Sequence, residues 1–164
     1  MKKNFLILIC SLSLMSCSHT YYVVRHAEKA AGSGTMNSDP PLSAIGETRA
    51  QQLKELLKDE KIKKIYSTRF IRTRKTAEPL RALKGLEIVE YGPAPDSLFI
   101  ATLKSQRLNT LIVGHSNTVD DIVNGLTGEN SVPGDLDESV YDQLYVITYK
   151  RFPFKNRKFQ KRIF

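Results

Sequence analysis

The chain has 164 residues, of which 41% are hydrophobic and 26% are charged. This length allows one domain with a core of its own and excludes two, and the composition is that of an ordinary soluble protein. The formal net charge of +8 is typical of nucleic-acid-binding proteins. However, Lys2, Lys3 and seven basic residues after Tyr149 supply this excess, and Ser18 to Tyr149 has a formal charge of −1. A nucleic-acid partner is therefore disfavoured.

The first 17 residues have the pattern of a secretory signal peptide. A basic start, Met1-Lys2-Lys3, precedes an apolar stretch from Phe5 to Leu14 that is too short to span a bilayer stably. Leu14-Met15-Ser16-Cys17 then resembles the lipobox of bacterial lipoproteins, in which the cysteine carries lipid. We therefore expect residues 1–17 to be a signal peptide with a lipobox, and the mature protein to be exported and anchored through Cys17 to a membrane of the bacterial cell envelope. The alternative is a soluble secreted protein with a chance cysteine.

Strand-like and helix-like segments alternate from Tyr21 onward. The first, Tyr21–Val24, has four consecutive apolar residues, which is typical of a strand buried on both faces of a parallel sheet. Further strands are expected at 64–66, 86–91, 110–113 and 144–149, and helices at 43–60, 70–83, 97–108 and 117–126. This alternation predicts one α/β domain at 18–149, a three-layer αβα sandwich with a mostly parallel central sheet of about five strands.

Residues 150–164 are expected to be a basic C-terminal tail outside the domain. Phe152, Phe154 and Phe159 alternate there with Lys and Arg, a pattern that could stack on nucleic-acid bases. In an exported protein, a solvated or membrane-surface extension explains the same pattern more simply.

Arginine and histidine residues follow the predicted strands where each strand ends. Arg25 and His26 follow the first strand, Arg72 lies at the start of the second helix, and His115 follows the strand at 110–113. The carboxyl ends of strands form the ligand-binding edge of an open α/β sheet, so these four side chains should share a pocket. Paired guanidinium groups bind tetrahedral oxyanions, and histidine can be a neutral nucleophile near pH 7. The pattern predicts phosphoryl transfer through a phosphohistidine. The alternative is that each residue makes an ordinary structural ion pair or hydrogen bond.

Four segments support a more specific hypothesis. They are Arg25-His26-Ala27-Glu28, Pro41–Gly46, Ser67–Ala77 and Val113–Asn117. Together, and in this order, they resemble the histidine phosphatase superfamily, also called phosphoglycerate-mutase-like, over roughly Tyr21 to Tyr149.

The resemblance implies a role for each candidate residue. His26 would be the phosphorylated nucleophile, Arg25 and Arg72 would bind the phosphoryl oxygens, and His115 would hydrogen-bond the phosphoryl group. Arg69 and Arg74 would then be exposed. The implied activity is a phosphatase that needs no cofactor or metal ion and acts on a small phosphorylated substrate or a phosphoprotein.

One element of the family pattern has no clear match. Many members carry an acidic residue after the third strand that protonates the leaving group, and here that region is shortened to Glu90–Asp96. Glu90 is the candidate general acid, with Asp96 and Glu28 as alternatives. Without such an acid, the enzyme should prefer aryl phosphates, acyl phosphates or phosphohistidine over sugar phosphates and phosphoglycerates, because their leaving groups need little or no protonation.

Two other interpretations remain open. A catalytically silent phosphate-binding or scaffolding module would carry the same motifs, because motifs report residue identity and not turnover. A metal site formed by His26, His115 and Asp39 is disfavoured, because Arg25 would repel a cation.

Overall fold

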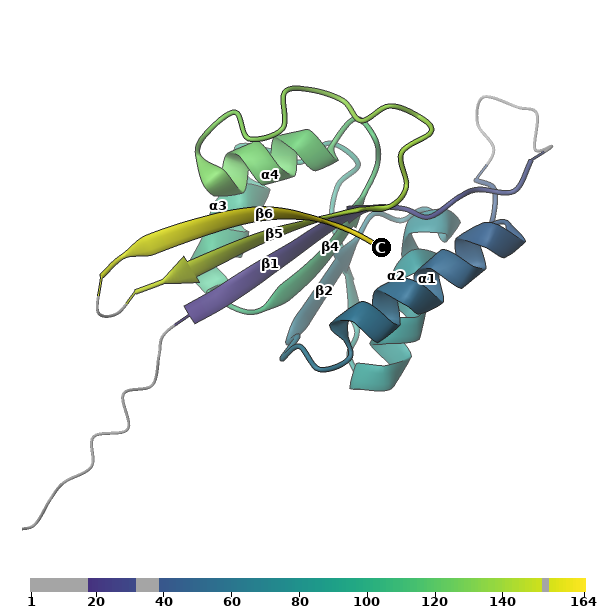
Figure 1. Cartoon of the computed structure of the whole chain (residues 1–164), viewed down its shortest axis with the longest axis horizontal. Coiled ribbons are helices and arrows are strands. Elements are labelled where there is room, and N and C mark those ends of the chain that lie inside the picture. The colour runs from purple at the N-terminus through teal and green to yellow at the C-terminus, as the bar shows by residue number, and fades with distance from the viewer. Residues whose placement is uncertain (1–17, 32–38, 152–153) are drawn as a thin grey trace, which may run out of the picture.

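A computed structural model describes residues 18–31, 39–151 and 154–164 (Figure 1). The predicted signal peptide at 1–17 lies outside the described residues. The elements are β1 (Ser18–Arg25), α1 (Ala44–Leu57), β2 (Lys64–Ser67), α2 (Ile71–Lys84), β3 (Ile88–Glu90), α3 (Ser97–Gln106), β4 (Thr110–Gly114), α4 (Val119–Thr127), β5 (Gln143–Lys150) and β6 (Asn156–Ile163). No described helix is both long and apolar enough to cross a membrane.

One six-stranded sheet organises the fold, with the strand order β3-β2-β4-β1-β5-β6. Parallel pairs join β3 to β2, β2 to β4 and β4 to β1, whereas β1–β5 and β5–β6 are antiparallel. The expected α/β class is confirmed. The expectation of about five mostly parallel strands is wrong, because β5 returns along β1 in the opposite direction and β6 extends the sheet. We call the edge where β1 to β4 end the carboxyl edge, and the edge where they begin the amino edge.

Most of the predicted basic tail is strand β6, so the expected solvated extension and the domain boundary at residue 149 are wrong. The register pairs β5 with β6 from Gln143–Ile163 to Lys150–Asn156. Phe159 is partly buried against the core and stacks on Tyr145 at 6.2 Å between ring centroids. Lys and Arg on an edge strand discourage pairing with other chains. The basic residues that led to the expectation of a tail are therefore compatible with an edge strand.

Helices cover both faces of the sheet (Figure 1). Tyr21 and Val23 of β1 belong to one buried cluster with residues of α3 and α4. Tyr22 and Val24 belong to a second cluster with residues of α1 and α2. Successive strand residues point to opposite faces, so an uninterrupted apolar run is what a strand covered on both sides requires.

Local capping interactions fix the helices that border the carboxyl edge. The Ser43 side chain accepts a hydrogen bond from the backbone N–H of Gly46 and begins α1. Gly46 approaches the preceding loop so closely that a Cβ there would lie 2.2 Å from the carbonyl oxygen of Glu28. Gly85 ends α2 in the left-handed conformation. The start of α1 is thus held against the loop that follows β1.

Candidate active site

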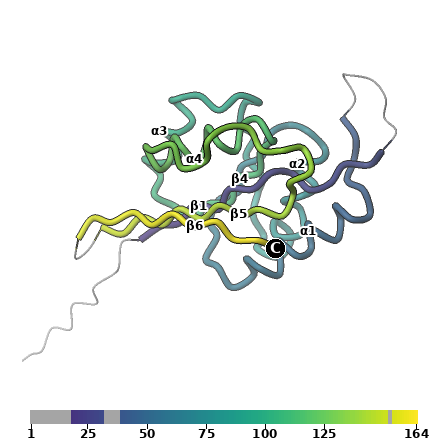
Figure 2. Tube along the Cα trace, turned by 45° about the horizontal axis from the view of Figure 1, so that its top comes forward, coloured from purple at the N-terminus to yellow at the C-terminus, as the bar shows by residue number. Residues whose placement is uncertain are grey.

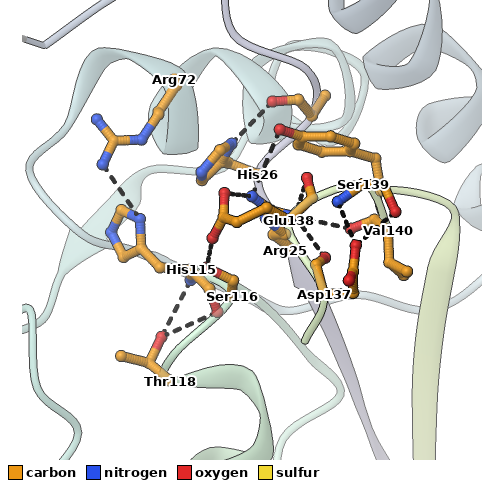
Figure 3. A network of polar contacts seen from close by, with 12 residues as sticks. Arg25, His26, Arg72, His115, Ser116, Thr118, Asp137, Glu138, Ser139 and Val140 are labelled. Carbon is orange, nitrogen blue, oxygen red and sulfur yellow. Dashed lines mark hydrogen bonds and ion pairs between the residues drawn. The ribbon is translucent and has the colours of Figure 1, made fainter. Parts of the chain in front are cut away.

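The four predicted site residues line one cleft at the carboxyl edge. Arg25 ends β1 opposite Gly114 of β4, so the residues that follow these strands, His26 and His115, become neighbours with ring centroids 5.5 Å apart. Arg72 reaches the same cleft from the first turn of α2 (Figure 3). The cleft has a volume of about 290 Å³. Arg69 and Arg74, which flank Arg72 in sequence, are exposed as expected.

His26 is held in one tautomer. Its Nδ1 lies 2.8 Å from the carbonyl oxygen of Ala27, and a carbonyl can only accept, so Nδ1 carries the proton. The lone pair is then on Nε2. The His26 side chain is buried, and burial, together with the charges of Arg25 and Arg72, lowers its pKa to about 3. At neutral pH the ring is therefore uncharged, as a nitrogen nucleophile must be.

His115 is oriented by threonine hydroxyls that the sequence analysis did not single out. Its Nε2 lies 2.9 Å from Oγ1 of Thr68, which lies 2.9 Å from Oγ1 of Thr73. On the other side, Nη2 of Arg72 donates to Nδ1 of His115 at 3.4 Å (Figure 3). Because a guanidinium can only donate, Nδ1 holds the lone pair and Nε2–H donates to Thr68. Burial and the nearby arginines lower the pKa of His115 to about 4, so it is neutral near pH 7.

Arg25 directs most of its donors at the loop before β5. Its Nη1 donates to the carbonyl oxygens of Asp137, Glu138 and Val140 at 3.0–3.1 Å. Its Nη2 pairs with Oε2 of Glu138 at 2.6 Å, and its guanidinium lies 4.1 Å from the ring centre of Tyr141. The resemblance implied that Arg25 binds phosphoryl oxygens. In this structure, both of its Nη groups instead bind the loop before β5.

Arg25 and Arg72 both line the cleft, and each carries one nitrogen without an acceptor among the described residues. Nε of Arg25 and Nε of Arg72 are buried and have no hydrogen-bond partner among the residues that the structure describes. A buried donor without an acceptor is costly, so each of these N–H groups would gain from an anion. Arg72 also lies 4.5 Å from the ring centre of Phe70, which lines the cleft.

None of the three acids considered from the sequence lines the cleft. Glu90 is exposed at the end of β3, and the Asp96 side chain caps α3 by accepting from the N–H of Phe99. Glu28 forms an ion pair with Arg49 at 2.6 Å. Burial alone would raise the pKa of Glu28, but the hydrogen bonds from Arg49 outweigh burial and lower it. The structure therefore gives no support to Glu90 as the general acid.

Glu138 is the carboxylate that lines the cleft, and the sequence analysis missed it. It lies between Arg25 and Ser116, whose hydroxyl donates to Oε1 at 2.5 Å (Figure 3). The hydrogen bond from Ser116 and the charge of Arg25 lower its pKa. Glu138 follows a polar loop, and no sequence motif marks it. It reaches the site only because that loop returns to the carboxyl edge.

Asp39, which the metal-site alternative requires, has other partners. Both of its carboxylate oxygens accept from the backbone N–H of Ile71, at 3.0 and 2.8 Å, and one lies 3.4 Å from Nη1 of Arg72. No cluster of three or more His, Cys, Asp or Glu side chains suited to a metal ion occurs within residues 18–31, 39–151 and 154–164.

Comparisons with known proteins agree with these motifs. Residues 21–91 match the family model described as histidine phosphatase superfamily (branch 1). "Probable phosphoglycerate mutase GpmB" of Photorhabdus laumondii is 30% identical over 121 residues, which cover 71% of this chain and 56% of that protein. The protein of the same name from Escherichia fergusonii is 31% identical over 115 residues, covering 68% and 53%. The chain thus spans about half the length of the curated relatives it matches.

Solved structures show the same fold. The protein histidine phosphatase SixA complexed with tungstate matches with a TM-score of 0.68 and 18% identity, covering 88% of this chain and 96% of that one. Mycobacterial glucosyl-3-phosphoglycerate phosphatase matches with a TM-score of 0.61 and 12% identity, covering 87% and 97%. The comparisons therefore identify the histidine phosphatase superfamily as the family of the matching segment, with phosphoglycerate mutase-like relatives in sequence and phosphatases among its neighbours in fold.

Proposed function

We propose that this chain is a metal-independent phosphatase that works through a phosphohistidine on His26. In the first step, Nε2 of His26 attacks phosphorus, the P–Nε2 bond forms, and the leaving group departs with the electron pair of its bond to phosphorus. In the second step, a water oxygen attacks phosphorus, the P–Nε2 bond breaks, and Nε2 regains its lone pair. Inorganic phosphate leaves, and the proton lost by the attacking water passes to solvent.

The observation that carries the proposal is the Nδ1–H bond from His26 to the carbonyl oxygen of Ala27, which leaves the lone pair on Nε2. Arg25 and Arg72 line the same cleft as His26, and each carries an Nε–H that has no acceptor among the described residues. The transition state of phosphoryl transfer spreads negative charge over three oxygens, so fixed cationic donors stabilise it. One fold neighbour binds tungstate, a tetrahedral oxyanion, which is consistent with this use of the cleft.

The state of Glu138 defines the substrates that we favour. Since its pKa is lowered, this carboxylate is ionised at neutral pH and is a poor proton donor. A negative charge in the cleft also favours a leaving group that departs neutral or cationic, such as the imidazole of phosphohistidine. Phosphohistidine, acyl phosphates and aryl phosphates should therefore be better substrates than sugar phosphates or phosphoglycerates, and mutase activity is not expected.

The test is to trap the covalent intermediate. After rapid mixing with ³²P-labelled acetyl phosphate and denaturing quench, the wild type should carry an acid-labile, base-stable label, and His26→Ala should carry none. His19→Ala is the matched control, because His19 lies at the amino edge, at the other end of β1. Label retained by His26→Ala, or lost equally from His19→Ala, would contradict the assignment. Phosphate binding without label or turnover would instead favour the catalytically silent module.

We also propose that the mature protein is exported and anchored through a lipid on Cys17, outside the described residues. The supporting observation is the signal-like segment and its lipobox pattern. Cys17→Ala should move the protein from the membrane fraction to the soluble fraction. A wild type that is already soluble would contradict this proposal.

A further inference from the structure

The amino edge carries a cluster of basic side chains that the proposed reaction does not use. Arg107, Lys150, Arg151, Lys155 and Arg157 border a hollow of about 520 Å³ beside the start of β1. We call these five residues the basic surface.

Separate parts of the chain build the basic surface. The sheet register places Ser18 opposite Lys150, and Lys150 opposite Asn156, so the end of β5 and the start of β6 lie beside the start of β1. Figures 1 and 2 both show the end of β5 and the start of β6 near the start of β1. Arg107 joins from the C-cap of α3, where it adopts a left-handed conformation with φ of 51°. The charges therefore converge through tertiary structure and are not merely neighbours in sequence.

Few acids neutralise the basic surface. Arg157 pairs with Glu129. Within the described parts of the chain, the ion pairs include none with Arg107, Lys150, Arg151 or Lys155. Positive charges that are held together without acidic partners favour the binding of an external anion. Because these exposed charges are spread over three elements, they match an extended anionic surface better than a small anion.

An exposed aromatic side chain accompanies these charges. Phe154, which lies just before β6 and between Arg151 and Lys155 in the sequence, has 81% of its surface exposed. An apolar side chain flanked by cations is the combination that binds the interface of an anionic bilayer, where the ring enters the headgroup region and the cations contact phosphate. A free phosphate would give Phe154 no such environment.

We propose that the basic surface and Phe154 rest on an anionic lipid bilayer, with the catalytic cleft facing away from it. β1 is eight residues long, and a strand advances about 3.3 Å per residue, so the cleft lies on the order of 23 Å from the start of β1. Cys17, the proposed lipid-bearing residue, directly precedes β1 in the sequence. A lipid there would hold the same edge against the bilayer. The reacting phosphoryl group would then come from the surrounding solution or from a soluble protein and not from the supporting membrane.

The orientation can be tested with single tryptophan probes, because the chain contains no tryptophan. Phe154→Trp places a probe just before β6, and Leu98→Trp places one at an exposed position near the start of α3, at the carboxyl edge. With full-length protein on vesicles of phosphatidylcholine and phosphatidylglycerol, brominated lipid should quench Phe154→Trp and leave Leu98→Trp unchanged. Equal quenching of both probes, or of Leu98→Trp alone, would overturn the orientation.

The electrostatic part is tested by matched charge removal. Arg151→Gln with Lys155→Gln should weaken binding to phosphatidylglycerol-containing vesicles by about 30-fold at low salt, and added salt should remove the difference. Arg74→Gln with Lys75→Gln removes the same two charges from exposed positions on α2 and should leave binding unchanged. Binding to vesicles of pure phosphatidylcholine measures how much the apolar N-terminal segment contributes to vesicle binding.

Three results would refute the bilayer contact. The first is an equal loss of vesicle binding in both double variants. The second is equal binding of the wild type to both kinds of vesicle. The third is tighter binding of the wild type to a single-stranded oligonucleotide than to the anionic vesicles. Turnover of a soluble substrate should not change in Arg151→Gln with Lys155→Gln, so this proposal and the phosphatase proposal can fail separately.

Discussion

The two edges of the sheet carry positive charge in different ways. At the carboxyl edge, Arg25 is 3% exposed and has partners for both Nη groups, and only its Nε lacks one among the described residues. At the amino edge, Lys150, Arg151 and Lys155 are exposed. A buried, fixed guanidinium with one donor unused suits a small anion in one geometry. Exposed flexible cations suit a broad, exchangeable anionic surface. The same residue types therefore favour catalysis at one edge and adhesion at the other.

The largest expected effect concerns the leaving group at the carboxyl edge. General acid catalysis contributes about 10²–10⁴-fold, so an enzyme without it should favour aryl over alkyl phosphates by a factor in that range. A plot of log(kcat/KM) against leaving-group pKa should have a steep negative slope when chemistry limits the rate. A flat plot that becomes steep in Glu138→Gln would show that Glu138 donates a proton despite its ionised state. A flat plot that becomes steep in Glu90→Gln would restore the acid expected from the sequence.

The next effect separates arginine from lysine at the two edges. Arg72→Lys should lower kcat/KM by about 10²-fold, because a compact ammonium cannot reproduce the planar donors that stabilise the transition state. Arg74→Lys, on the exposed side of the same helix, and Arg151→Lys, at the amino edge, should leave kcat/KM unchanged. If kcat/KM fell as far in Arg74→Lys as in Arg72→Lys, the assignment of Arg72 to the phosphoryl oxygens would be wrong.

The sequence was sufficient for the parts of the fold that depend on local pattern. The apolar run Tyr21–Val24 predicted the buried strand β1, and the alternation of strands with helices predicted the α/β fold. Arg25, His26, Arg72 and His115 were placed in one cleft, because the ends of parallel strands meet at one edge.

The parts that failed depend on distant contacts. Nothing local marks the segment after Tyr149 as a strand, since its regularity comes from pairing with β5. Glu138 likewise has no motif, and it enters the site only because Arg25 binds the carbonyl groups of its loop. Glu90 was favoured by position in sequence, but β3 ends with its side chain in solvent.

A smaller effect tests whether Glu138 competes with the substrate for Arg25. Removing this negative charge should strengthen binding of inorganic phosphate by about tenfold, the scale of one screened charge a few ångströms away. Titration of Glu138→Gln with phosphate would measure this, and Glu90→Gln is the control because it removes an exposed carboxylate outside the cleft. Weaker phosphate binding in Glu138→Gln would show that the carboxylate chiefly positions Arg25.

The smallest expected effect is a pH dependence of stability that belongs to the carboxyl edge. Burial and the charges of Arg25 and Arg72 lower the pKa of His26 to about 3 in the folded protein, whereas an unfolded histidine has a pKa of about 6.5. Between these values the unfolded chain binds a proton that the folded chain does not, so stability falls as the pH drops below about 6.5. Between pH 8 and pH 6 this histidine alone should cost about 1 kcal/mol of unfolding free energy. Urea unfolding of His26→Asn should show that much less pH dependence than the wild type, and His19→Asn, at the partly exposed amino edge, should show a smaller change. Identical pH dependence in His26→Asn and wild type would mean that folded His26 accepts a proton readily, and the neutral nucleophile would then lose its physical basis.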